Sequence, residues 1–94
     1  MTNSNYRKGA DFERRVKKKL ESDGWIVFRS AGSHSPADLI AAKRDTQKFE
    51  YLLIQCKGGG AGLTKREKAE FKEYAESHGF QAVLASAGLV LEFL

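Results

Sequence analysis

Three polar side chains in this sequence have the types and spacing of a hydrolytic site. Asp38, Gln55 and Lys57 follow the pattern D-x16-Q-x-K, and the last two lie in the apolar run 49–57. Because successive side chains of a strand point to opposite faces, Gln55 and Lys57 should leave one face together near the strand end. A carboxylate at the tip of a neighbouring strand would give oxygen ligands for a hard divalent cation beside a positive charge. This combination is typical of phosphodiester cleavage.

Two helices are expected to flank the strands that hold these side chains. Phe12, Val16 and Leu20 repeat every four residues, which predicts a helix over residues 8–22. The pattern at 64–67, Thr-Lys-Arg-Glu, is a capping box and predicts the start of a second helix that ends near Gly79.

The strands are expected between and after these helices. Alternating or apolar β-branched stretches predict strands over residues 25–29, 37–42, 49–57, 81–85 and 89–94. Asp38 is then expected to open the second strand, and residues 43–48 to form a polar hairpin connection. The glycine-rich stretch 58–62 is expected to be a hinge or a place where two backbones approach closely. The predicted order is αβββαββ, an α/β arrangement in a single domain over residues 1–94.

Composition narrows the class of protein. The 94 residues contain one Cys, so no intramolecular disulfide framework can form, and no apolar run is long enough to span a bilayer. The first residues lack the apolar stretch of a signal peptide, so we expect a cytoplasmic protein without a membrane partner. The net charge is +4, and residues 1–19 hold seven Lys or Arg against two acidic residues. This basic segment would attract a polyanion, although a solvated helix face has the same pattern.

Several other kinds of site do not match the sequence. The glycine-rich stretch is not followed by the Gly-Lys-Ser or Gly-Lys-Thr of a phosphate-binding loop. One Cys and two separated His residues do not have zinc-site spacing. Cys56 lies on the apolar face of its predicted strand, which favours a buried structural thiol over a nucleophile assisted by His34 or His78.

Four blocks of sequence together resemble the archaeal-type Holliday junction resolvases of the PD-(D/E)XK nuclease superfamily. They are Tyr6–Ala10 continuing to Phe12–Arg14, then Arg29–Ser33, Ala37–Ala41 and Ile54–Lys57. The resemblance extends from Tyr6 through the second helix. It implies a restriction-endonuclease-like mixed β-sheet flanked by helices, a two-fold homodimer, and Mg²⁺-dependent nicking of two strands of a four-way DNA junction, with Mn²⁺ as a substitute metal.

The resemblance also implies a set of site residues. The catalytic set is Glu13, Asp38, Gln55 and Lys57. The metal ligands are Glu13, Asp38, Gln55 and the carbonyl of Cys56. Among DNA contacts, the resemblance implies Arg14, Arg29 and Ser33. A basic surface that binds phosphates would add Arg7, Lys8, Ser30 and His34, although an exposed side chain without a ligand is the alternative for His34. In this scheme Lys57 orients the attacking water or stabilises the charge that develops on the phosphate.

Gln55 departs from the family pattern, which usually has Glu at this position. The amide oxygen can still ligate a hard cation, but the site has one negative charge fewer. Two alternative functions therefore stay open: another endonuclease of the superfamily, restriction-like or specific for nicks or flaps, and a non-catalytic DNA-binding module with the same fold. Structural roles are also open, because Asp38 could cap a turn after Pro36 and Glu13 could pair with Lys17.

The surface of the expected homodimer is not fixed by the sequence. Phe71, Tyr74, Phe80 and the apolar tail 89–94 offer more apolar surface than a chain of this size easily hides. Core packing is the alternative for each of them, and we favour it for Phe80 and Leu91.

Overall fold

One mixed sheet of five strands organises the fold. The computed structural model describes the backbone of residues 4–30, 35–59 and 62–94, and their side chains except those of residues 4–8. The elements are α1 (Ser4–Ser22), β1 (Ile26–Arg29), β2 (Leu39–Asp45), β3 (Lys48–Lys57), α2 (Lys65–Ser77), β4 (Gln81–Ser86) and β5 (Val90–Phe93). The strands lie in the order β1-β2-β3-β4-β5. Only β3 and β4 pair in parallel among these strands, and the predicted order αβββαββ is confirmed.

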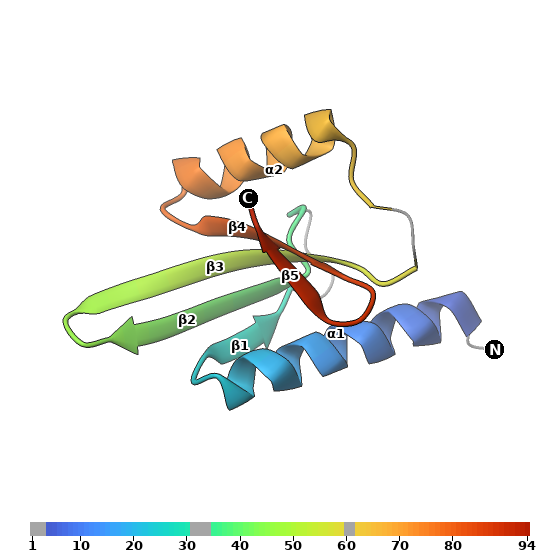
Figure 1. Cartoon of the computed structure of the whole chain (residues 1–94), viewed down its shortest axis with the longest axis horizontal. Helices are drawn as coiled ribbons and strands as arrows, with labels where there is room; N and C mark the ends of the chain where they lie inside the picture. Colours follow the sequence, from blue (N-terminus) through green and yellow to red (C-terminus); the bar gives the residue numbers. More distant parts are fainter. Residues whose placement is uncertain (1–3, 31–34, 60–61) are drawn as a thin grey trace.

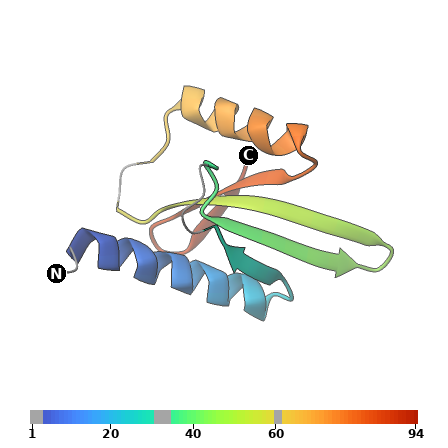
Figure 2. The same ribbon diagram turned by 180° about the vertical axis from the view of Figure 1, so that it is seen from behind.

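The two helices cover opposite faces of the sheet (Figures 1 and 2). The apolar stripe of α1 is buried with Leu39, Ile54 and Val83 in one core cluster. On the other face, Phe71 and Ala75 of α2 pack with Leu53 in a second cluster. The stripe of α1 matches the four-residue repeat that predicted this helix. Helix α2 also provides the crossover that a parallel strand pair requires.

The pleat of β3 divides its side chains between the two helices. Ile54 is buried against α1, and Cys56 packs against the same cluster. Leu53 belongs to the cluster under α2, and Gln55 lines a cavity with residues of α2. The predicted alternation along this strand is therefore confirmed.

The hairpin between β2 and β3 differs from the prediction. We expected residues 43–48 to be a connection, but β2 continues to Asp45 and β3 begins at Lys48. The register places Lys43 opposite Glu50 and Asp45 opposite Lys48. Cross-strand pairs of opposite charge favour strand pairing, so the polar composition did not mark a loop. The hairpin tip extends beyond both helices (Figure 1).

Two further boundaries also differ. Helix α1 begins at Ser4, earlier than the predicted residue 8. The prediction was late because the apolar repeat starts only at Phe12 and contains no information on the preceding turns. Strand β2 begins at Leu39, so Asp38 lies in a bend before the strand and does not open it. No helix in the described part of the chain combines the length and apolar character that a bilayer-spanning helix requires.

Candidate active site

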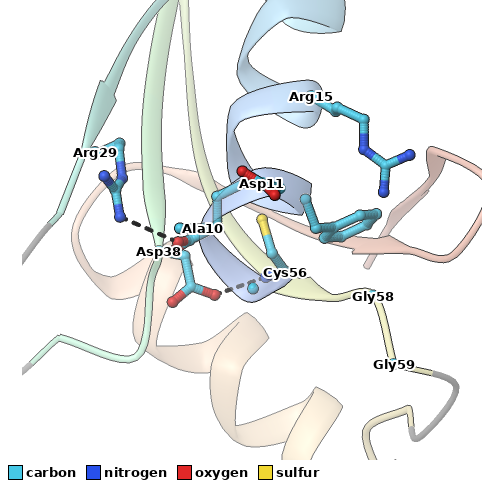
Figure 3. A pocket seen from close by; sticks show the side chains of 11 residues that line it. Ala10, Asp11, Arg15, Arg29, Asp38, Cys56, Gly58 and Gly59 are labelled. Atoms are coloured by element: carbon cyan, nitrogen blue, oxygen red, sulfur yellow. Dashed lines mark hydrogen bonds and ion pairs between the residues drawn. The ribbon is translucent and has the colours of Figure 1, made fainter. Parts of the chain in front are cut away.

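The acidic residues Glu13 of α1 and Asp38 line one cavity between α1 and the ends of β1 to β3 (Figure 3). The cavity has a volume of about 950 Å³. Its wall is formed by residues 9–13 and Arg15 of α1, Arg29 of β1, Asp38, Cys56 and residues 58–59. The structure thus brings together two predicted catalytic carboxylates that are distant in the sequence.

Asp38 is held by the backbone of the strands on both sides. Its amide donates a hydrogen bond to the Ile54 carbonyl at 2.8 Å, and its carbonyl accepts one from the Ser30 amide at 2.9 Å. Its side-chain Oδ2 accepts a hydrogen bond from the Cys56 amide at 2.7 Å. The carboxylate therefore has a fixed position at the end of β3. This bond also gives Asp38 a structural role, different from the turn cap considered from the sequence.

Glu13 lies in a less favourable environment for a negative charge. Partial burial raises the pKa of Glu13, the charge of Asp38 raises it further, and Arg29 opposes both effects. Arg29 Nη2 lies 3.4 Å from Glu13 Oε2, and their side chains are 43% and 19% exposed. The alternative pairing with Lys17 is absent among the described ion pairs, where Lys17 bonds Glu21 instead. Two neighbouring carboxylates with one partial counter-charge form a place where a cation is electrostatically favoured.

Cys56 lines the same cavity and is the single cysteine of the chain. Burial raises the pKa of its thiol to about 12, and the charges of Asp38 and Glu13 act in the same direction. The thiol therefore stays protonated near neutral pH, where the thiolate is the nucleophilic form. Cys56 is partly buried, in contrast to the fully buried thiol that we expected, but its protonated state agrees with the structural role that we favoured.

Gln55 and Lys57 do not line the cavity that contains Glu13 and Asp38. Gln55 lines a smaller cavity between β3 and α2, of about 320 Å³, together with Glu67, Glu70 and Tyr74. Hydrogen bonds with the backbone and side chain of Thr64 lower the pKa of Glu67, and the charge of Lys57 contributes in the same direction. The predicted quartet is thus divided between the two faces of β3, with Asp38 bonded to the backbone of the strand end between them.

The predicted DNA contacts have different settings. Arg14 pairs with Asp11 at 2.8 Å on the exposed side of α1, Arg29 pairs with Glu13, and Ser30 bonds Asp38 through its amide. Arg7 and Lys8 lie in α1, but their side chains are outside the described ones, and Ser33 and His34 are outside the described residues.

Sequence reasoning missed two further residues at this cavity. Arg15 lines it, with its guanidinium 5.7 Å from the centre of the Phe12 ring. Gly58 lines it next to the same ring. The available signals were the position of Arg15 two residues after Glu13, and that of Gly58 directly after Lys57.

The fold and the cavity together define a class. A mixed sheet lies between two helices, with one acidic side chain from the first helix and one from the bend before the second strand, next to the end of the third. This is the arrangement expected for a nuclease of the restriction-endonuclease-like class. The family model described as archaeal Holliday junction resolvase (Hjc) matches residues 4–86. The chain therefore belongs to the Hjc family.

Individual relatives agree with this assignment. The crossover junction endodeoxyribonuclease Hjc of Methanocaldococcus jannaschii is 50% identical over 83 residues, which cover 85% of this chain and 59% of that protein. The chain thus matches little more than half of the length of that relative. A solved structure of Archaeoglobus fulgidus Hjc, a Holliday junction resolvase, matches with a TM-score of 0.67 at 26% identity, over 93% of this chain and 71% of that one.

Proposed function

We propose that this chain is a structure-selective DNA endonuclease that resolves four-way junctions by metal-dependent phosphodiester hydrolysis, with a single nuclease domain over residues 1–94. The observation that supports this best is the pair of carboxylates, Glu13 and Asp38, in one cavity at the end of β3. The family assignment and the name of the M. jannaschii relative, a crossover junction endodeoxyribonuclease, support the same reaction.

The carboxylate oxygens in the cavity at the end of β3 are suitable ligands for a hard divalent cation. Asp38 uses Oδ2 to accept from Cys56, and two carboxylates of like charge share the cavity. Across the described residues, no three His, Cys, Asp or Glu side chains form a metal-binding group, so the set needs oxygens of another kind. In our proposal the Gln55 amide and the Cys56 carbonyl provide them. Mg²⁺, or Mn²⁺ in its place, would supply Lewis-acid polarisation of the scissile phosphate.

The side chains of the chain itself have distinct roles in this proposal. Glu13 and Asp38 hold negative charge at the strand end, and Arg29 limits the repulsion between them. Lys57 follows Cys56 directly and presents an ammonium group at the same strand end. We assign it to orienting the attacking water or to stabilising the charge that develops on the phosphate. Arg14 and Arg29 would contact DNA phosphates, together with Arg7, Lys8, Ser30, Ser33 and His34. Contacts to phosphates fix the position of the DNA on the protein but do not recognise its base sequence.

The function is tested by cleavage of a synthetic four-way junction with Mg²⁺, with Mn²⁺ and with EDTA. We expect paired nicks near the branch point with either metal and none with EDTA. Duplex, flap and nicked DNA of the same sequence serve as competing substrates. If the protein cleaves one of these in preference to the junction, that DNA is its substrate in place of the junction, and the nuclease assignment stands.

A second candidate is a non-catalytic DNA-binding module with this fold. The observation that favours it is the position of Gln55, which lines the cavity facing α2 and not the cavity of Glu13 and Asp38. This candidate predicts junction binding by gel shift without cleavage at any Mg²⁺ or Mn²⁺ concentration. A Mg²⁺ titration of both readouts on one preparation distinguishes the two.

We further propose that the active form is a two-fold homodimer that packs through the uncovered part of the sheet face under α2. Ile26 and Phe28 of β1 are 56% and 58% exposed, and Phe49 and Tyr51 of β3 are 63% and 44% exposed. The register aligns Ile26 with Ala42 and Tyr51 across three strands, so these side chains share one face. Phe71, in contrast, is 3% exposed and belongs to the core. Clustered aromatic side chains of this kind are typical of homodimer interfaces, and two copies would suit a branched DNA.

Light scattering at micromolar concentration tests the homodimer. We expect a dimer mass for the wild type and a monomer mass for Phe28→Lys, because the charge would be buried without a partner at the interface. Val90→Lys is the matched control, since Val90 is also 56% exposed but lies on β5 at the other edge of the sheet. A wild-type monomer that nicks both strands in one binding event would contradict the symmetric arrangement.

A further inference from the structure

Helix α1 and the end of β3 touch at an unusually close contact between Phe12 and Gly58. A Cβ atom added to Gly58 would lie 2.7 Å from Phe12 Cγ and 2.9 Å from each Cδ atom. These distances are far inside van der Waals contact, which lies at about 3.5–4.0 Å between carbon atoms. Any side chain at position 58 would therefore require a movement.

Gly58 is needed for space and not for an unusual backbone conformation. Among the described glycines, a left-handed backbone occurs at Gly24, Gly79 and Gly88 and not at Gly58. Gly62 of the same segment, in contrast, would receive a Cβ with nothing within 4 Å. The composition of the segment left a hinge and a close approach open, and the contact with Phe12 favours a close approach at Gly58.

The phenyl ring cannot easily turn away to make room. The nearest atom is Cγ, the first atom beyond Cβ, so its position depends on the helix backbone and on one torsion angle. Phe12 is 5% exposed and belongs to the core cluster with Val16 and Leu20. A larger residue at position 58 would therefore displace the first turns of α1 from the end of β3.

The contact joins the two halves of the proposed active site. Phe12 directly precedes Glu13 in α1, and Gly58 directly follows Lys57. Two residues before Gly58, the Cys56 amide holds the Asp38 carboxylate. Phe12 and Gly58 both line the cavity that contains Glu13 and Asp38, with Gly58 and Cys56 visible beside α1 in Figure 3.

We propose that Phe12 and Gly58 are positioning residues of the nuclease: the missing side chain at position 58 lets the Phe12 ring rest on the strand end, which sets Glu13 against Asp38 and Lys57. This inference rests on the proposed function for its catalytic consequence, and on the contact itself for its structural part. Neither residue touches the substrate in this scheme. Their substitution should therefore change the rate of cleavage more than the affinity for DNA.

Gly58→Ala is the main test, with Gly62→Ala as the matched control. We expect the single-turnover rate of junction cleavage at saturating protein to fall about 10- to 100-fold in Gly58→Ala, as for a displacement of catalytic groups by about 1 Å. Junction affinity in EDTA should stay within about twofold, because the basic surface is unchanged. Gly62→Ala should match the wild type in both. Equal losses of affinity and rate in Gly58→Ala, with a lower melting temperature, would reduce the contact to a structural one and overturn the proposal.

A double-mutant cycle with Phe12→Ala tests whether the ring is the partner. Phe12→Ala removes all three atoms that the new Cβ would meet. We expect it to lower the rate by itself, and Gly58→Ala to have no further effect in its presence, which is a coupling between the two positions. Independent and additive losses would overturn the proposed pair.

Thiol labelling of Cys56 gives a readout that does not depend on cleavage. Cys56 is the single cysteine and lines the same cavity. At one pH and well below the melting temperature, displacement of α1 should speed its labelling in Gly58→Ala several-fold, with no change in Gly62→Ala. Identical labelling and cleavage in Gly58→Ala and wild type would overturn the proposal. If the wild type cleaves no junction, the proposed function fails, and the labelling contrast still decides whether the contact sets α1 against β3.

Discussion

Asp38 combines a structural and a proposed catalytic role in one carboxylate. One oxygen accepts from the Cys56 amide at 2.7 Å. Asn at this position can keep that hydrogen bond through its amide oxygen, but it loses the negative charge. We therefore expect Asp38→Asn to fold and bind junctions normally while the cleavage rate falls about 100-fold or more, the scale found when a group that stabilises charge is removed. Nicking assays and gel shifts measure the two effects.

Asp45→Asn is the control for that substitution, because Asp45 lies exposed at the hairpin tip. It should leave both cleavage and binding unchanged. Loss of junction binding in Asp38→Asn parallel to the loss of cleavage would assign Asp38 to folding or DNA contact instead.

Gln55 is the residue whose role is least defined by its position. Its side chain faces α2, where Glu67 and Glu70 line the same cavity. If its oxygen is a metal ligand, Gln55→Glu adds a negative charge at nearly constant shape, and the Mg²⁺ concentration for half-maximal cleavage should decrease. Metal-dependence curves of the two proteins test this. An unchanged midpoint would remove Gln55 from the ligand set.

The raised pKa of Cys56 predicts an alkaline loss of stability. Burial holds the folded-state pKa at about 12, above the ordinary value of 9.0. Above pH 9 the Cys56 thiol loses its proton in the unfolded chain but keeps it in the folded one. The contribution of this thiol to the free energy of unfolding is therefore complete below pH 9 and is lost as the pH rises toward 12. Between pH 8 and 10 the free energy of unfolding of wild type should fall about 1 kcal/mol more than that of Cys56→Ala. Urea unfolding at both pH values measures this difference, and parallel changes in the two proteins would contradict it.

The periodicity of apolar residues, together with the capping box at 64–67, was sufficient to predict the order of helices and strands. The stripe of Phe12, Val16 and Leu20 matches a buried face in the structure, and residues 52–54 are the buried part of the apolar run before Lys57. The hairpin was misread because Lys43 and Asp45 are polar, although their cross-strand partners are oppositely charged. Such pairing depends on register, which composition does not contain.

The sequence was sufficient to predict which residue types belong to the candidate site, but not how they are arranged. The spacing of Asp38, Gln55 and Lys57 correctly indicated two side chains on one strand face. It did not indicate that Asp38 would bend out of β2 to bond Cys56, because this depends on the tertiary approach of the strand ends. The contact of Phe12 with Gly58 was hidden for the same reason, since it forms between residues distant in the sequence.

The capping box at the start of α2 should make a measurable contribution to the free energy of unfolding. The Thr64 side chain accepts from the Glu67 amide at 3.1 Å, and the Glu67 carboxylate accepts from the Thr64 amide at 2.9 Å. This reciprocal bonding confirms the predicted capping box. Thr64→Ala should lower the free energy of unfolding by about 1 kcal/mol, and Thr64→Ser should keep most of it, because Ser retains the hydroxyl. Urea denaturation of the three proteins tests this, and equal stabilities would mean that water replaces the cap.

Positive charge is concentrated in the first helix. Residues 1–19 hold seven of the 16 Lys and Arg residues, whereas residues 58–94 hold four of them against five acidic residues. Since α1 also provides Glu13, a phosphate backbone attracted to this helix would be brought to the cavity. The surface that attracts DNA and the proposed catalytic cavity then lie on the same side of the molecule. Helix α2 has no corresponding excess of positive charge.

This asymmetry predicts how junction affinity depends on salt. Each phosphate neutralised by Arg or Lys releases counterions, so the logarithm of the binding constant should fall with the logarithm of salt concentration by about 0.9 per contact. Arg14→Ala should reduce this slope by about 1 per protomer.

Arg66→Ala is the matched control, because Arg66 is also paired with a carboxylate within its own helix, Glu70 at 3.1 Å, but lies on α2. Arg14 makes the corresponding pair with Asp11 at 2.8 Å on α1. Titrations of a labelled junction at several salt concentrations, in EDTA to prevent cleavage, give the three slopes. If both substitutions reduce the slope equally, the DNA contacts both helices, and the assignment of the phosphate-binding surface to α1 must be abandoned.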